Sequence, residues 1–124
     1  MTYSGGVGWD VRLLHEVESW LLALDNDSYD QVSAAIDKLE SDGPTLGRPL
    51  VDRIEGSRHH NMKELRPGSA GRSEIRVLFI FDPERRAVLL VAGDKAGDWS
   101  KWYARNISVA DGRYDEWLRG KRDL

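Results

Sequence analysis

The chain of 124 residues contains no cysteine. It therefore has no disulfide, no thiolate zinc site and no cysteine nucleophile, and this absence fits a cytoplasmic location. It also lacks an apolar run of the roughly 18 residues that would indicate a membrane-spanning helix. Residues 1–12 carry neither the basic nor the apolar stretch of a signal peptide, so we expect none. The length predicts one domain over residues 1–124, which we expect in the cytoplasm because the chain lacks cysteine.

The familiar motifs of cofactor-dependent catalysis are also missing. The sequence has no GxGxxG stretch, no phosphate-binding P-loop and no GxSxG motif. His15, His59 and His60 do not share the helical spacing of metal ligands. We therefore expect no metal and no small-molecule cofactor. The enzymatic options narrow to chemistry that protein acids, bases and cations perform alone.

Positive charge is scarce in the first part of the chain. The net charge is -3, but residues 1–45 carry a net of -7, residues 46–86 a net of +3 and residues 87–124 a net of +1. The acidic part has mostly helical patterns and the basic part mostly strand patterns. A locally positive face attracts a polyanion even on an acidic protein, because screening confines each field to about 10 Å. Solvated acidic helices beside an ordinary sheet would give the same distribution.

The acidic part predicts a strand followed by two helices. Apolar and polar residues alternate over 9–13, which indicates a short strand with one buried face. Helical spacing then predicts a helix over 15–24 and a second helix that Asp27 caps and that ends at Gly43. Because few residues join the two helices, we expect an antiparallel hairpin.

The remaining chain predicts a sheet and a helical end. Residues 43–58 are rich in glycine and proline and indicate a loop, and strands are expected over 59–66, 74–82 and 86–92. The last two strands are apolar on both faces, so we expect helices on one face and an incompletely covered face with a ligand groove.

A capping box at Ser108 and Asp111 predicts a helical C-terminal segment. The predicted fold class is therefore α+β. It consists of a short N-terminal strand, a two-helix hairpin, a three-stranded antiparallel meander that completes one sheet, and the C-terminal helical segment.

Basic side chains stand around the predicted strands, where they could bind phosphate. Metal-free RNA cleavage needs only such groups. A base removes the 2′-OH proton, an acid supports the leaving 5′-oxygen, and cations stabilise the phosphorane. The candidate residues are Arg66, Arg76 and Lys95 as cations, and Lys63, His60 and Tyr103 as proton carriers or positioning groups.

Each candidate also has an ordinary structural explanation. A strand-end arginine such as Arg76 reaches water along its aliphatic stem. Arg66 fits an exposed position beside a turn, Lys63 a solvent-facing strand position, and His60 an exposed loop. Tyr103 fits helix packing as well as base stacking. The residue types alone leave both explanations open.

The order of short motifs resembles the RelE/ParE toxin superfamily, and within it the HigB-like, phage-derived branch. A Glu-Leu-Arg strand end at 64–66 precedes a glycine-containing turn and an Arg-Val-Leu-Phe strand at 76–79. A short hairpin and a second apolar strand follow, and then Gly93 and Lys95. The loop Gly43–Leu50 also resembles that branch. The resemblance covers roughly residues 9–105.

This resemblance implies the α+β fold described above and the toxin half of a type II toxin–antitoxin pair. It implies a metal-independent endoribonuclease that cleaves mRNA on the ribosome and is neutralised by a helix-turn-helix antitoxin, with no membrane partner. Arg66, Arg76 and Lys95 match the family's basic residues by position, whereas Tyr103 matches after a gap and Lys63 only approximately.

The chain also departs from the family pattern. It is acidic overall where RelE-type toxins are usually basic, and Asp94 weakens the positive field at Lys95. Two other readings of the same fold remain open. One is a ParE-like toxin that inhibits gyrase, and the other is an inactive relative that only binds its antitoxin.

Overall fold

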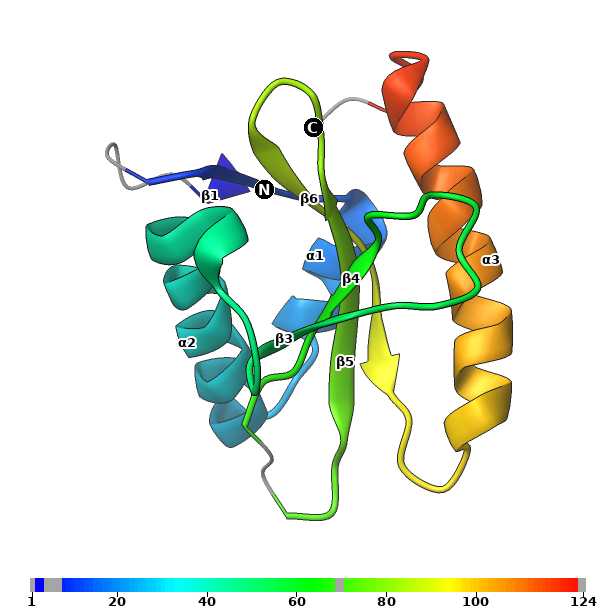
Figure 1. The fold of residues 1–124 in the computed structure, drawn as a ribbon. Coiled ribbons are helices and arrows are strands. Elements are labelled where there is room, and N and C mark those ends of the chain that lie inside the picture. Colours follow the sequence, from blue (N-terminus) through cyan, green and yellow to red (C-terminus); the bar gives the residue numbers. More distant parts are fainter. Residues whose placement is uncertain (1, 4–7, 69–70, 123–124) are drawn as a thin grey trace.

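A six-stranded sheet forms the centre of the computed structural model, which describes residues 2–3, 8–68 and 71–122 (Figure 1). In chain order the elements are β1 (Thr2–Tyr3), β2 (Asp10–Leu13), α1 (His15–Leu22), α2 (Asn26–Asp42), a 3₁₀ helix (Gly43–Thr45), β3 (Val51–Arg53), β4 (Lys63–Leu65), β5 (Ile75–Phe81), β6 (Arg86–Asp94) and α3 (Trp99–Leu118). Of the predicted glycine-containing turn, residues 69 and 70 lie outside the described residues.

The strands are ordered β1-β2-β6-β5-β4-β3, so β5 and β6 are central. Strands β2 and β6 are parallel, and all other neighbours are antiparallel. The predicted α+β class is confirmed, as are the N-terminal strand and the helix pair. The meander, however, has four strands, because Val51–Arg53 pairs with Lys63–Leu65 inside the segment predicted to be a loop. A strand of three residues between glycines and prolines is too short to produce a recognisable period.

The two N-terminal helices cover one face of the sheet. Asp25, not Asp27, caps α2, because the Asp25 carboxylate accepts a hydrogen bond from the Ser28 backbone N–H at 3.0 Å. The inward residues of both helices pack against alternate residues of β5, including Val77 and Phe79. This apolar layer is the larger of the two cores in the described chain.

Helix α3 covers much of the opposite face, so this face is less open than predicted (Figure 1). The helix begins at Trp99 rather than at Ser108, and it buries Trp102 and Tyr114 against Leu78 and Ile80. Asp111 does not cap a helix N-terminus. It lies in the middle of α3 and turns inward to a loop, which a local capping motif does not reveal.

A β-bulge in β6 adjusts the sheet to α3. Leu78 pairs with Val91 and Phe79 pairs with Leu89, so Leu90 is an extra residue. Leu90 and Val91 consequently both face α3. The Leu90 carbonyl accepts a hydrogen bond from Nη1 of Arg113 in α3 at 2.8 Å. The bulge therefore links the strand backbone directly to the helix.

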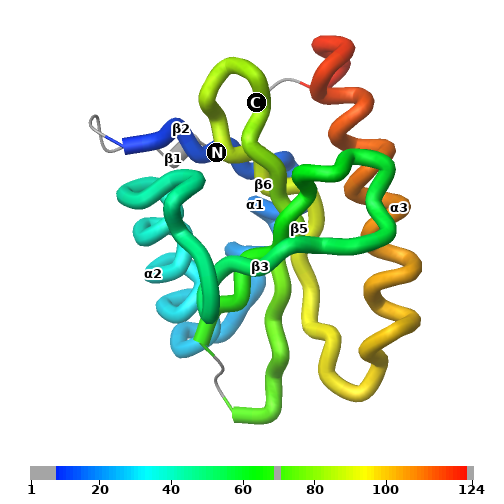
Figure 2. The backbone as a smooth tube through the Cα atoms, in the orientation of Figure 1, coloured from blue at the N-terminus to red at the C-terminus, as the bar shows by residue number. Residues whose placement is uncertain are grey.

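The loop between β3 and β4 reaches across to α3 (Figure 2). Asp111 accepts hydrogen bonds from Ser57 Oγ at 2.5 Å and from the Arg58 backbone N–H at 3.0 Å. One turn later, Asp115 contacts Arg58 Nη2 at 2.7 Å and His59 Nε2 at 2.9 Å. We call these five residues the loop clasp. The clasp fixes a long connection, which would otherwise cross open surface, to the helix that carries Tyr103.

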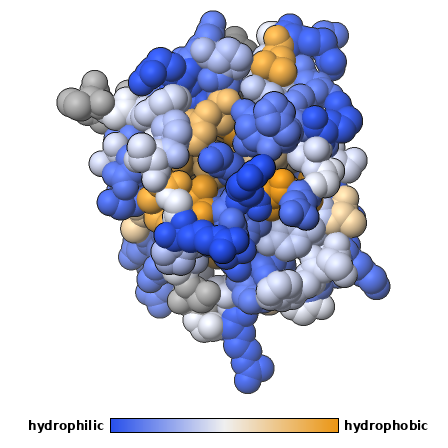
Figure 3. Space-filling view, viewed as in Figure 1, coloured by the Kyte–Doolittle hydropathy of each residue, from blue (hydrophilic) through white to orange (hydrophobic). Residues whose placement is uncertain are grey.

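Hydrophilic residues cover most of the surface in this view, and apolar residues show in a few separate patches (Figure 3). None of the helices in the described part of the chain combines the length and apolar character needed to cross a bilayer.

Helix α1 is tied to the C-terminal residues through Glu16. A hydrogen bond from Arg122 Nη1 at 2.6 Å lowers the Glu16 pKa to about 2, and the nearby Arg113 acts in the same direction. Because the folded pKa lies below the unfolded value, this contact stabilises the protein above about pH 4.5 and is lost as the pH falls toward 2. We expect Glu16→Gln to flatten the acid side of the curve of unfolding free energy against pH. Parallel curves for the variant and the wild type would contradict the assignment.

Candidate functional site

Three of the six predicted site residues gather around one buried carboxylate, that of Glu64 in β4. Glu64 is 2% exposed. Its Oε1 accepts a hydrogen bond from Arg66 Nε at 2.7 Å, and its Oε2 accepts one from the Tyr103 hydroxyl at 2.8 Å. Arg76 Nε lies 3.5 Å from Glu64 Oε1. We call Glu64, Arg66, Arg76 and Tyr103 the Glu64 cluster.

The sheet geometry explains why these residues meet. Side chains alternate along a strand, so Glu64 and Arg66 point to one face, and Arg76 shares that face on β5 with Leu78. Glu64 lies opposite Leu78 in the register between β4 and β5. Helix α3 passes over the same face and adds Tyr103 from a position 39 residues further along the chain.

Gly93 makes room for the helix beside the cluster. It lies opposite Arg76 in the register between β5 and β6. A Cβ at this position would stand only 2.9 Å from Nε1 of Trp102. The glycine of the sequence motif is therefore required for close approach of α3 to the sheet.

The Arg76 guanidinium is fixed in place, but not all of its N–H donors are hydrogen-bonded. Its Nη1 donates to the Ile75 carbonyl at 2.8 Å, and its side chain is 14% exposed. Within the described part of the chain, its buried Nε has no hydrogen-bond acceptor, since the contact with Glu64 is an ion pair without hydrogen-bond geometry. A guanidinium of this kind retains donor capacity for an additional anion.

Lys95 lies beside the cluster beneath Trp99. Its residue exposure is 1%, and its Nζ stands 2.9 Å from the centroid of the Trp99 ring. Burial lowers the pKa of Lys95, and the Arg76 guanidinium lowers it further. Trp99 itself is 59% exposed and donates its Nε1–H to Glu74 Oε2 at 3.1 Å. Trp99 therefore separates the Lys95 ammonium from solvent.

The Tyr103 hydroxyl is a hydrogen-bond donor to Glu64. Burial, followed by its hydrogen bond to Glu64, raises the Tyr103 pKa to about 12. The phenol consequently stays protonated at neutral pH, where its hydroxyl donates a hydrogen bond to the Glu64 carboxylate.

A pH titration of the tyrosine side chains tests this assignment. We expect the ¹³Cζ resonance of Tyr103, identified by its loss in Tyr103→Phe, to remain that of a phenol through pH 10 and to move only toward pH 12. Because the folded pKa exceeds the unfolded value, the stabilising contact is present below pH 10 and is lost as the pH rises further. A midpoint near 10 would contradict the contact with Glu64.

A surface groove of about 290 Å³ opens beside the cluster. Its apolar wall comes from Ile54, Trp99 and Ile107, and its polar lining includes Glu64 and Arg66. The loop clasp holds the segment that supplies Ile54. The groove thus joins an aromatic surface to guanidinium and phenol donors, a combination that suits an unpaired nucleotide.

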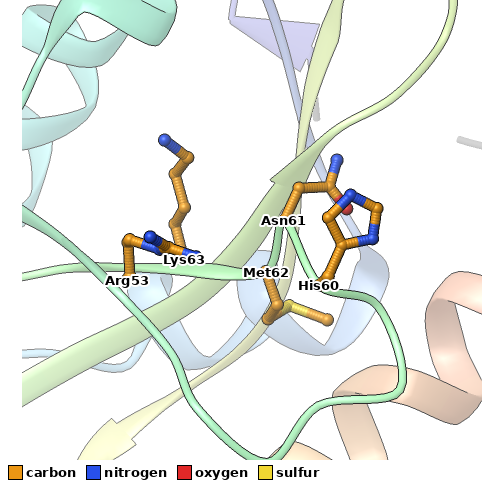
Figure 4. A pocket seen from close by; sticks show the side chains of 5 residues that line it. All are labelled: Arg53, His60, Asn61, Met62 and Lys63. Atoms are coloured by element: carbon orange, nitrogen blue, oxygen red, sulfur yellow. The ribbon is translucent and has the colours of Figure 1, made fainter.

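Lys63 and His60 are not part of this arrangement. They line a separate hollow of about 330 Å³ with Arg53, Asn61 and Met62 (Figure 4). In Figure 4 the side chains of Lys63 and Arg53 lie at the left of the view, and the His60 ring lies at the right. Lys63 directly precedes Glu64, and consecutive strand residues point to opposite faces. The histidine that contacts α3 is His59.

Glu64 and Trp99 are the residues that sequence reasoning missed as members of the site. In the sequence, Glu64 appears only as the first residue of the Glu-Leu-Arg motif. A single glutamate in a strand normally faces solvent, so nothing marked it as part of a site. Its alternation with Arg66 could have indicated a shared face, but not the burial by α3. Among the described residues, no group of three or more histidine, aspartate or glutamate side chains is placed to hold a metal ion.

Comparisons with known proteins agree with the motif order. Residues 19–115 match the family model "Phage derived protein Gp49-like (DUF891)". The chain is 54% identical over 112 residues to "Putative toxin HigB2" of Mycobacterium tuberculosis, covering 90% of this chain and 55% of that protein. It is 57% identical over 108 residues to "Putative toxin HigB3" of the same organism, covering 87% of this chain and 92% of that protein.

The chain thus spans about half the length of the first relative and nearly all of the second. The matched region contains the whole Glu64 cluster, because it extends from residue 19 to residue 115. The predicted relationship to the HigB-like, phage-derived branch is confirmed, and the chain belongs to the Gp49-like family.

Proposed function

We propose that the chain is the toxin of a type II toxin–antitoxin system and acts as a metal-independent, ribosome-dependent mRNA endonuclease. The observation that carries this proposal is the convergence of two guanidinium groups and a protonated phenol on one point beside a surface groove. The relatives named as HigB toxins support the toxin role.

The cluster supplies the cations and the proton donor of metal-free cleavage. In the proposed reaction the RNA 2′-hydroxyl gives its proton to a water molecule while its oxygen attacks the adjacent phosphorus, and the bond from phosphorus to the 5′-oxygen breaks as that oxygen takes up a proton. Arg76 stabilises the charge on the phosphorane, while Arg66 holds a neighbouring phosphate. Tyr103 fits the acid or a positioning donor, because its hydroxyl keeps its proton at neutral pH.

The remaining candidates have more distant roles. Lys95 would hold a flanking phosphate after Trp99 moves aside, since the indole now covers its ammonium. Lys63 and His60, which line the separate hollow, would contact neighbouring parts of the RNA or take part in proton transfer. We further propose that a helix-turn-helix antitoxin neutralises the chain by covering the groove or by blocking entry to the ribosome.

Induced expression with primer extension tests the reaction and its dependence on translation together. One reporter message is translated, and a matched message carries a destroyed start codon. We expect growth arrest and new 5′ ends in the translated message alone. Intact messages during growth arrest with an SOS response would favour a gyrase-inhibiting toxin instead. Normal growth with intact messages would leave only the inactive, antitoxin-binding relative.

A further inference from the structure

The Glu64 carboxylate is held in the way that proteins hold a bound oxyanion. Arg66 Nε and the Tyr103 hydroxyl donate to it at 2.7 and 2.8 Å, and Arg76 Nε faces it at 3.5 Å. A phosphate oxygen accepts hydrogen bonds from the same donor types at the same distances. Under the proposed function, the RNA phosphate therefore shares Arg66 and Tyr103 with a carboxylate that already accepts their hydrogen bonds.

The other charges near the cluster lead to the same conclusion. Arg66 is shared with a second carboxylate, because its Nη2 lies 3.4 Å from Asp52 Oδ2. Lys95 remains covered by Trp99. The buried Nε of Arg76 has no acceptor among the described residues. The resting site therefore contains cations whose field is largely cancelled by Glu64 and Asp52.

We propose that Glu64 is an internal counter-ion that competes with an RNA phosphate for Arg66, Arg76 and Tyr103, and so limits the RNA affinity of the site. This inference rests on the proposed function for the identity of the ligand. A purely structural Glu64 would act in the opposite direction, because its loss would loosen the arginines and weaken binding. The two roles therefore predict opposite changes in RNA affinity when the charge of Glu64 is removed.

The test compares Glu64→Gln with wild type, using a short single-stranded RNA whose 2′-hydroxyls are methylated to prevent cleavage. Glutamine retains an acceptor for Arg66 but carries no charge. We expect the dissociation constant to fall about tenfold, as measured by fluorescence anisotropy. The plot of log affinity against log salt should also steepen by about 0.7, the increment for one additional phosphate contact on a single strand.

Asp82→Asn is the matched control. Asp82 is also a buried carboxylate, and it accepts from Arg86 Nε at 2.8 Å and from Trp117 Nε1 at 3.0 Å. This substitution changes the net charge by the same amount outside the cluster. We expect its RNA affinity to stay within about twofold of wild type. Equal tightening in both variants, or weaker binding by Glu64→Gln, would overturn the counter-ion role.

Arg76→Ala separates this inference from the proposed function. If the RNA binds wild type and Arg76→Ala equally, the cluster does not bind phosphate and both proposals fail. If Arg76→Ala loses affinity while Glu64→Gln does not gain it, only the counter-ion role is overturned. A gain by Glu64→Gln together with a loss by Arg76→Ala supports both proposals.

A measurement on the wild type keeps the inference testable if Glu64→Gln does not fold. With ¹⁵N-labelled arginine, saturation with the methylated RNA should shift the Nε–H resonances of Arg66 and Arg76. The Nε–H of Arg86, which stays bonded to Asp82, is the internal control. Unchanged Arg66 and Arg76 signals at saturation would show that no phosphate takes these donors.

Discussion

Replacing Arg76 with alanine should abolish growth inhibition and lower the rate of message cleavage by at least about 100-fold, the usual cost of losing a preorganised donor to a charged transition state. The side chain is 14% exposed and fixed by its hydrogen bond to the Ile75 carbonyl, so the guanidinium is positioned before the substrate arrives. Single-turnover cleavage of a ribosome-bound message measures the effect.

Two further variants show whether this loss is specific. Arg76→Lys keeps the positive charge but lacks the planar fork, so it should recover only part of the rate. Arg86→Ala removes another partly buried arginine at the far end of the same strand pair, and it should keep its toxicity. Full cleavage by folded Arg76→Ala would remove Arg76 from the mechanism.

Replacing Asp111 with alanine should lower the free energy of unfolding by about 3 kcal/mol, because hydrogen bonds to a buried charged group contribute about 1.5–3 kcal/mol each. Asp111 is 4% exposed, and it accepts from the Ser57 hydroxyl and the Arg58 backbone N–H. The substitution breaks the buried half of the loop clasp and leaves both donors without their acceptor. Urea denaturation followed by tryptophan fluorescence measures the change.

Asp115→Ala is the comparison for this prediction. Asp115 contacts Arg58 and His59 in the same clasp, but from a more exposed position where water screens its charge. We expect a smaller loss of stability than for Asp111→Ala. Equal losses in the two variants would mean that burial of Asp111 contributes nothing to the clasp.

Much of the fold could be predicted because strong periodic patterns lie in long elements. The strand predicted over 74–82 is apolar on both faces as expected, because Val77 and Phe79 lie in one core and Leu78 and Ile80 in the other. The errors fall where the local pattern was brief or misleading. Strand β3 has three residues, and Ser108 with Asp111 imitated a helix start inside α3.

The sequence was enough to predict the arginines of the Glu64 cluster, but not the carboxylate at its centre. The order of strand-end motifs identified Arg66 and Arg76, which depend on local sequence. The central position of Glu64 depends on its hydrogen bond with Tyr103, which lies 39 residues further along the chain. No local sequence rule predicts that hydrogen bond. Lys63 could have been excluded from the cluster by simple alternation with Glu64.

Helix α3 also determines when the site can exist during the protein's own synthesis. A nascent chain that has emerged only through β6 carries Arg66, Arg76 and Glu64 on a sheet with one bare apolar face. It lacks Tyr103, and it lacks the aspartates that hold the loop over the groove. Because chains begin to fold from the N-terminal side as they are made, the complete donor set appears only when α3 has left the exit tunnel and docked. The order of elements along the chain thus delays assembly of the cluster until translation has passed the helix.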